Sequence, residues 1–350
     1  MNKKSFASNK RRPELSIVSP VFLAEQSLEP LVQAIDSAVQ GMDVDGYEIV
    51  LVEDGSPDNS WSAIQQICRR LEHVKGVRFS RNFGQHYAIT AGLNASAGNW
   101  VVVMDCDLQD DPAYIPELYA AARAGYDVVY TVKQSRRHRG IKNVLSKWFH
   151  RVVNLLVADP RQRTNANVGN FSILSRNAVD AFLSISEYHR HYLGVLRWIG
   201  FNSTSIETAH RERLHGETSY TLWRLVREAV NAITSQSDRL LYASILLGFA
   251  FMTSAVLAAV YIVVRYFISG FQEGWASVMV LMLLSTGVIL LCLGVVGVYL
   301  GKVFEQTKFR PLYLVQERLN FGDVEHSEIT GSLIKSKEKL QSVGGPRAGV

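Results

Sequence analysis

Short apolar runs and amphipathic segments alternate along the first 131 residues of the chain. Five apolar runs predict strands, and the segments between them carry apolar residues at helical spacing. The predicted strands are Leu15 to Phe22, Tyr47 to Glu53, Val77 to Ser80, Trp100 to Asp105 and Asp127 to Val132. The predicted helices lie near residues 28–40, 58–73, 84–97 and 113–124. This order predicts an α/β fold, a doubly wound and mostly parallel sheet that binds ligands at the carboxyl ends of its strands.

Two much longer apolar runs follow in the second half. No charged residue occurs in the 25 positions from Leu240 to Val264 or in the 28 positions from Gly274 to Gly301. A membrane-spanning helix needs about 20 apolar residues, so both runs predict transmembrane helices. Lysines and arginines gather before the first run and after the second, which predicts that both ends of this hairpin face the cytoplasm.

These patterns divide the chain into five parts. We expect a flexible basic arm over residues 1–14, the α/β domain over 15–212 and a juxtamembrane amphipathic helix over 213–239. The transmembrane hairpin covers 240–303, and a cytoplasmic tail covers 304–350, with disorder after about residue 320. Residues 141–157 and 218–235 have the apolar stripe of interfacial helices, although an ordinary core helix has the same periodicity.

Charge and cysteine content narrow the classes of function. The net charge is +5 and the isoelectric point is 9.0, but no basic block is interleaved with aromatic residues as in nucleic-acid-binding proteins. The positive charge lies beside apolar segments instead, which favours a membrane surface. The three cysteines lack the spacing of a disulfide framework or a zinc site, which fits a reducing compartment. The polar N-terminus has no signal-peptide pattern.

Two carboxylates stand where the fourth predicted strand ends. Asp105 and Asp107 flank Cys106, and side chains alternate along a strand, so both carboxylates can point the same way. Such a pair suits Mg²⁺ or Mn²⁺, with diphosphate oxygens completing the octahedron. The alternative is a structural turn, because Asp111 and Pro112 resemble the start of a helix.

Polar residues also follow the second and third predicted strands. Asp54 can accept hydrogen bonds from a base or ribose. Arg81 can neutralise phosphate, and Gly84, three residues later, starts the next predicted helix. The structural alternatives are a helix N-cap for the first loop and a solvated surface charge for Arg81. The sequence has no G-x-G-x-x-G or G-x-x-x-x-G-K-[ST] after the first strand, so we expect the diphosphate to be held through metal.

Several motifs in order resemble inverting family 2 glycosyltransferases, in particular the polyprenyl-phosphate group that includes dolichyl-phosphate mannose synthases and bactoprenol glucosyltransferases. The motifs are I-V-S-P-V-F, E-I-V-L-V-E-D-G-S-P-D, S-R-N-F-G-Q-H-Y-A, V-V-M-D-C-D-L-Q-D-D-P, H-G-E-T-S-Y and R-P-L-Y-L-V-Q-E. The resemblance implies a GT-A-type fold and a metal held by Asp105, Asp107 and Gln109. The predicted nucleotide-sugar-binding residues are Pro20, Val21, Phe22, Glu25, Asp54, Arg81, Gly84, Asp105, Cys106 and Asp107.

The sequence departs from the family pattern at two places. Phe22, Leu23 and Ala24 occupy the last three places of the family's P-V-Y-N-E, so Ala24 stands at the glutamate and Glu25 comes one residue later. Asn170 and Ser172 replace the aspartate and arginine of G-D-F-R-L, so an ionised base is lost there. A lipid phosphate needs no such base, because its second pKa is about 6 and it is already ionised near neutral pH.

We therefore predict a membrane-bound enzyme that moves one sugar from a nucleotide sugar to a polyprenyl phosphate, and we expect undecaprenyl phosphate as the acceptor. Asp105 and Asp107 are predicted catalytic residues together with the acceptor-binding arginines, with Mg²⁺ or Mn²⁺ as the cofactor. The predicted acceptor-phosphate residues are Arg136, Arg137, Arg139 and Lys142. The alternative is that these residues form a solvated basic loop that touches lipid headgroups. We expect a plasma-membrane homo-oligomer with cytoplasmic termini. The alternatives are a processive polysaccharide synthase and a catalytically idle membrane scaffold.

Overall fold

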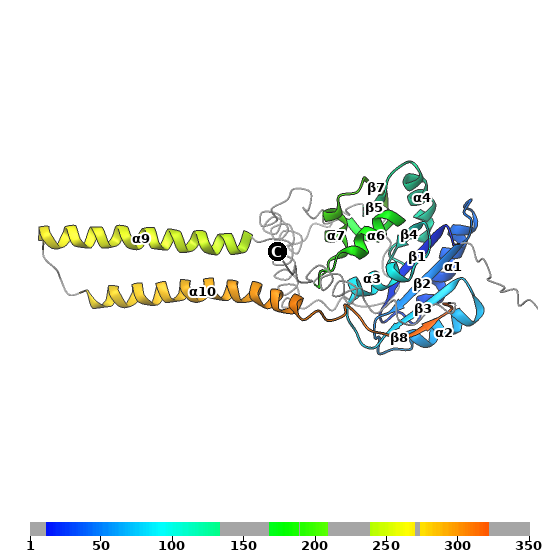
Figure 1. Cartoon of the computed structure of the whole chain (residues 1–350), viewed down its shortest axis with the longest axis horizontal. Coiled ribbons are helices and arrows are strands. Elements are labelled where there is room, and N and C mark those ends of the chain that lie inside the picture. The colour runs from blue at the N-terminus through cyan, green and yellow to red at the C-terminus, as the bar shows by residue number, and fades with distance from the viewer. Residues whose placement is uncertain (1–11, 134–167, 189, 209–238, 270–273, 322–350) are drawn as a thin grey trace, which may run out of the picture. The chain divides into compact units, whose positions relative to one another are not determined.

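The computed structural model describes residues 12–133, 168–188, 190–208, 239–269 and 274–321 (Figure 1). The chain divides into two compact units. The first comprises Met1–His138, Thr164–Thr218 and Phe309–Val350, and the second comprises Arg139–Arg163 and Ser219–Lys308. The predicted amphipathic helices at 141–157 and 218–235 lie outside the described residues.

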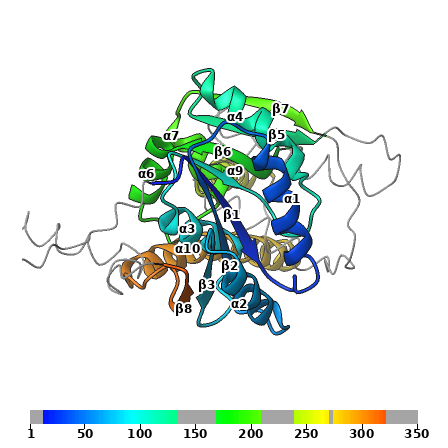
Figure 2. The ribbon, with the colours of Figure 1, turned by 90° about the vertical axis from the view of Figure 1, so that its right-hand side faces the viewer.

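The first unit is built on a sheet with the strand order β7-β5-β6-β4-β1-β2-β3-β8 (Figure 2). The strands are β1 Leu15–Val21, β2 Tyr47–Glu53, β3 Val74–Phe79, β4 Trp100–Val103, β5 Val128–Lys133, β6 Val168–Ser175, β7 Ser203–Thr208 and β8 Val315–Leu319. The pairs β1–β2, β1–β4, β2–β3 and β5–β7 are parallel. The pairs β3–β8, β4–β6 and β5–β6 are antiparallel. The predicted mostly parallel α/β sheet is confirmed.

Helices cover both faces of this sheet. They are α1 Leu28–Gln40, α2 Ser60–Arg70, α3 Gln85–Ala95, η1 Pro112–Tyr114, α4 Ile115–Arg123, α6 Arg176–Ser184 and α7 Tyr192–Ile199. One apolar core packs α1, α2 and α4 against strand residues such as Ile17 and Val102. The other packs α3, α6 and α7 against the alternate residues, such as Val18 and Val103. The central strands are continuous apolar runs because both of their faces are buried.

Strand β8 brings the segment after the second long helix back to the sheet. Tyr313 is buried and stacks on Phe79, with ring centroids 5.0 Å apart. The Glu317 carboxylate accepts hydrogen bonds from Trp61 Nε1 at 3.0 Å and from Gln65 Nε2 at 3.3 Å. The sequence predicts a tail for these residues, because the strand itself is polar and its partners lie far away in the chain.

The second unit contains two long helices, α9 Arg239–Ser269 and α10 Trp275–Thr307. They cover the two uncharged runs. The segments Leu241–Ala258 and Leu284–Thr307 are long and apolar enough to cross a membrane. The helices touch where Cys292 Sγ lies 3.5 Å from the Ser244 carbonyl oxygen. Large apolar side chains such as Leu246 and Leu293 are exposed on them, as a lipid-facing surface requires.

Candidate functional site

Four parallel strands end at one edge of the sheet and carry the predicted site residues there. Val21 at the end of β1 pairs with Glu53 at the end of β2, and Glu53 pairs with Arg78 of β3. On the other side of β1, Val18 pairs with Val103 at the end of β4. The loops that follow these strands therefore converge at the edge where open α/β sheets bind ligands.

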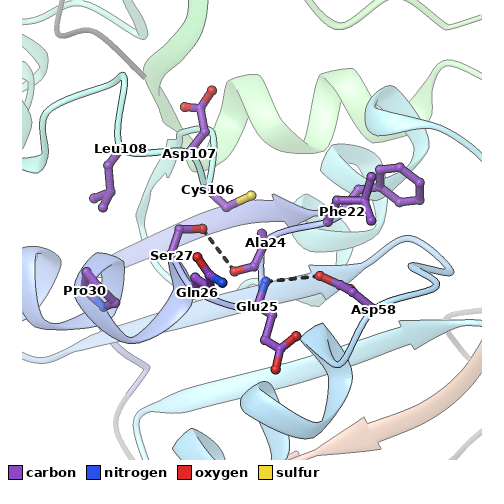
Figure 3. Close-up of a pocket in the computed structure, with 11 residues that line it drawn as sticks. Phe22, Ala24, Glu25, Gln26, Ser27, Pro30, Asp58, Cys106, Asp107 and Leu108 are labelled. Carbon is purple, nitrogen blue, oxygen red and sulfur yellow. Dashed lines mark hydrogen bonds between the residues drawn. The ribbon is translucent and has the colours of Figure 1, made fainter. Parts of the chain in front are cut away.

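The loop after β4 contains the two predicted metal ligands. Asp105 is half-buried, and its Oδ1 accepts a hydrogen bond from Gln85 Nε2 at 2.7 Å. Asp107 Oδ1 accepts the Gln109 backbone N–H at 3.1 Å. Leu108, between Asp107 and Gln109, has a φ of +58°, which is a sterically costly conformation for a branched side chain. In Figure 3 the Cys106 side chain lies toward the loop after β1, and the Asp107 carboxylate points away from it.

The same loop concentrates negative charge. Asp110 is almost fully buried, and its Oδ1 lies 3.0 Å from Lys133 Nζ at the end of β5. Burial and then the neighbouring carboxylates of Asp110 and Asp107 raise the pKa of Asp105 to about 7, against the opposing effects of Lys133 and of the Gln85 hydrogen bond. A divalent cation would favour the ionised forms of these carboxylates.

The donor chemistry fits a hard divalent cation. Asp105 and Asp107 offer carboxylate oxygens and Gln109 an amide oxygen, which are the ligand types that Mg²⁺ and Mn²⁺ prefer. Within the described ranges, no group of three or more histidine, cysteine, aspartate or glutamate residues could hold a metal ion. Such a cation would therefore need oxygens from the substrate, as Mg²⁺ sites at phosphates commonly do.

Asp54 follows β2 and is held by the loop after β3. Its carboxylate is only 3% exposed and accepts the backbone N–H of Phe83 at 2.7 Å and of Gly84 at 2.9 Å. Burial raises its pKa to about 6 despite these two hydrogen bonds. Gly55 has a φ of +61°, and a Cβ there would lie 2.3 Å from the Arg81 carbonyl carbon. The two loops are therefore in backbone contact, and a role of Asp54 at the nucleotide stays a prediction.

The loop after β1 is fastened to the loop after β2 by three backbone donors. Leu23 N–H donates to Ser56 Oγ at 2.9 Å, and Ala24 N–H donates to Ser60 Oγ at 3.1 Å. Glu25 N–H donates to Asp58 Oδ2 at 3.3 Å. Ala24, which departs from the family pattern, is therefore a small residue that is only 5% exposed and whose backbone is held by a hydrogen bond.

A cavity of about 320 Å³ lies between the loop after β1 and the loop after β4 (Figure 3). It brings together four predicted nucleotide-sugar residues, which are Phe22, Glu25, Cys106 and Asp107. Pro20 and Val21 are buried inside β1 instead. Arg81 is exposed, with its guanidinium 4.1 Å from the centroid of the Phe83 ring.

Strand β6 carries the second family departure. Val103 of β4, two residues before Asp105, pairs in antiparallel register with Ser172, two residues after Asn170. The Ser172 hydroxyl is buried and bonds to the Tyr192 hydroxyl at 2.8 Å. Ser172, which stands where the family has arginine, therefore links β6 to α7 through this hydrogen bond. The predicted acceptor residues Arg136, Arg137, Arg139 and Lys142 lie outside the described residues.

The sequence pattern does not reveal Gln85, Asp110 or Lys133 as partners in this site. Gln85 is a single polar residue at a helix start, and Asp110 had only the structural interpretation of a turn. Lys133 ends a strand whose neighbour in the sheet is β6, about 40 residues further along the chain. No periodicity in the sequence marks such contacts, because they depend on strand order.

Residues 16–182 match the family model described as "Glycosyl transferase family 2". An uncharacterized glycosyltransferase of Bacillus subtilis, YkcC, is 33% identical over 88% of this chain and 94% of its own length. The bactoprenol glucosyl transferase of Shigella phage SfX is 30% identical over 87% of this chain and 99% of its own.

An undecaprenyl-phosphate 4-deoxy-4-formamido-L-arabinose transferase of Enterobacter sp. is 30% identical, over 90% of this chain and 96% of its own length. Among solved structures, glucosyl-3-phosphoglycerate synthase from Mycobacterium tuberculosis, crystallised with Mn²⁺, UDP and phosphoglyceric acid, is 17% identical. The match covers 63% of this chain and 76% of that one, with a TM-score of 0.45.

Proposed function

Because the chain belongs to glycosyl transferase family 2, we propose that it transfers one sugar from a nucleotide sugar to a polyprenyl phosphate, with inversion at the anomeric carbon. The chain is a glycosyltransferase, and the proposal concerns its substrates. The observation that carries it is the Asp105–Asp107 turn at the sheet edge beside a cavity, in a chain that continues into two long apolar helices.

The relatives support the lipid acceptor. Two of them are named for bactoprenol and for undecaprenyl phosphate, and their similarity extends over about nine-tenths of this chain. The similarity therefore includes most of the apolar second half as well as the α/β domain. Their names give different sugars, so the proposal leaves the sugar and its nucleotide open.

The donor would lie along the strand ends. We assign the cavity and the neighbouring Asp54 loop to the nucleotide, and Asp105, Asp107 and Gln109 to a divalent cation, Mg²⁺ or Mn²⁺. When bound, this cation would act as a Lewis acid for the leaving nucleoside diphosphate. Lys133 is held close by through Asp110, and it adds a positive charge to a site that must accept an anionic donor.

The acceptor chemistry explains why the site can function with Asn170. A phosphate monoester is already largely ionised near neutral pH. One of its oxygens can attack the anomeric carbon while the bond from that carbon to the diphosphate breaks, and no proton has to be removed. Asn170 then needs only to bind or orient. Two anions must approach each other, and we assign Arg136, Arg137, Arg139 and Lys142 to the acceptor phosphate.

Membrane association follows from α9 and α10. We propose that both helices span the plasma membrane and that the catalytic unit is cytoplasmic, because basic residues flank the outer ends of the hairpin. A single cysteine within residues 269–272 of a cysteine-free chain should then react with an impermeant thiol reagent only from outside the cell. Labelling from the cytoplasmic side alone would reverse the orientation.

A release assay tests the acceptor class. Purified full-length enzyme in detergent with Mn²⁺ is mixed with a panel of nucleotide sugars, and free nucleoside diphosphate is measured. Undecaprenyl phosphate should stimulate release with one of these donors, while undecaprenol, which has the same chain without phosphate, should not. Equal stimulation by both lipids, or by neither with any donor, would contradict the proposal.

A further inference from the structure

Gln85 is the first residue of α3 and is exposed, yet its amide makes a short hydrogen bond inside the site. Its Nε2 donates to Asp105 Oδ1 at 2.7 Å. In the described part of the chain, no other side chain donates a hydrogen bond to the Asp105 carboxylate. A carboxylate held through one oxygen is restricted in rotation, and its second oxygen is left to face another ligand.

The backbone that carries Gln85 is fixed by Asp54. Two consecutive N–H groups, of Phe83 and Gly84, donate to the buried Asp54 carboxylate, and the next residue is Gln85. Gly84 has a φ of +114°, which glycine adopts readily and other residues rarely do, and helix α3 begins at the next residue. Residues 83–85 therefore connect the end of β2 to the loop after β4, although β1 lies between these two strands in the sheet.

Helix α3 itself has little freedom to move. Gly92 lies so close to the sheet that a Cβ would stand 2.2 Å from Val18 Cγ1 and 3.2 Å from Val52 Cγ2. Ala88, Ile89 and other residues of α3 are fully buried. An exposed glutamine on a mobile loop would lose conformational entropy on bonding to a carboxylate. Because α3 is packed against the sheet, the backbone of Gln85 is already ordered, and the hydrogen bond costs little further backbone entropy.

We propose that Gln85 is a positioning residue for the metal site, and that it orients Asp105 so that one carboxylate oxygen faces a divalent cation of the Mg²⁺ or Mn²⁺ type. This inference depends on the metal role of Asp105 in the proposed function. Carboxylate ligands of metals are commonly oriented by hydrogen bonds of this kind, and loss of such a partner typically weakens metal affinity 10- to 100-fold.

The test measures metal binding directly. Full-length enzyme is titrated with Mn²⁺ in the presence of UDP or of GDP, and free Mn²⁺ is followed by electron paramagnetic resonance. Gln85→Met keeps the length of the side chain but removes the donor, and it should raise the Kd for Mn²⁺ about tenfold. Gln85→Asn retains an amide on a shorter chain and should also weaken binding, and thermal unfolding checks the fold of both variants.

A matched control exists on α1. Gln33 Nε2 donates to Glu29 Oε1 at 3.2 Å on the exposed surface, so Gln33→Met removes a similar bond away from the site. Gln33→Met should bind Mn²⁺ as the wild type does. At saturating Mn²⁺ the Gln85 variants should recover most of the wild-type turnover, because the ligand Asp105 is still present.

The outcomes separate the two proposals. If the wild type binds no Mn²⁺ with either nucleotide, or Asp105→Asn binds it as well as the wild type, the metal site itself is wrong and the role of Gln85 is lost with it. If Asp105→Asn loses Mn²⁺ while folded Gln85 variants keep the wild-type Kd, only the role of Gln85 is overturned. Equal weakening by Gln33→Met would also overturn it.

Discussion

Asp54→Asn tests how burial and hydrogen bonding combine at the end of β2. The Asp54 carboxylate is 3% exposed and accepts two backbone N–H groups. Burial favours its neutral form more strongly than these bonds favour the ionised form, so the pKa rises from 3.8 to about 6. Asparagine has nearly the same shape and does not titrate, so the variant removes the pH dependence that this carboxylate contributes.

The sign and size follow from proton binding. Between pH 3.8 and about 6 the folded chain keeps the proton on Asp54 while the unfolded chain has released it. The wild-type free energy of unfolding therefore falls as pH rises through this range. At about 1.36 kcal/mol per pKa unit, the loss is on the order of 3 kcal/mol and is complete somewhat above pH 6.

The assay is urea unfolding of the full chain in detergent at several pH values, followed by tryptophan fluorescence. The difference in unfolding free energy, wild type minus Asp54→Asn, should fall by about 3 kcal/mol from acidic to neutral pH. A flat curve for Asp54→Asn, or one that rises with pH, would show that the two hydrogen bonds balance or outweigh burial.

Other predictions concern the reaction itself. Asp107→Ala should abolish transfer but leave thermal unfolding unchanged, and full activity in this variant or in excess chelator would remove the metal role. Asn170→Asp should change turnover by much less than the roughly 10²-fold effect of gaining an essential base, as steady-state kinetics would show. Neutralising Arg136, Arg137 and Arg139 singly should impair acceptor use severely in at least one variant while calorimetry shows normal donor binding. Wild-type acceptor kinetics in all three would place the acceptor phosphate elsewhere.

The strands could be predicted where burial on both faces makes a continuous apolar run. β1, β2 and β4 start at the predicted residues, whereas β3 begins three residues before the predicted Val77 because Lys75 interrupts its apolar pattern. β6, β7 and β8 were not predicted as strands. β6 lies between β4 and β5, and β8 pairs with β3 across more than 230 residues of sequence. Hydrophobic periodicity does not specify such non-local pairing.

The site shows the same limit. Strand alternation was sufficient to place Asp105 and Asp107 at the sheet edge as candidates, because that inference needs only local geometry. The contacts that hold them depend on helix packing and strand order. Gln85 reaches Asp105 because α3 lies on the sheet, and Lys133 reaches Asp110 from the end of β5. Asp54 was predicted to face a nucleotide, and the structure adds two backbone donors that fix its carboxylate.

The identity of the lipid product tests the proposed reaction directly. Purified enzyme is incubated with Mn²⁺, undecaprenyl phosphate and each member of a panel of nucleotide sugars, and the lipid fraction is analysed by mass spectrometry. We predict a single new lipid with the mass of undecaprenyl phosphate plus one sugar, formed by the wild type and absent with Asp107→Ala. Products with several sugars, or sugar transferred to an acceptor without phosphate, would contradict the proposed reaction.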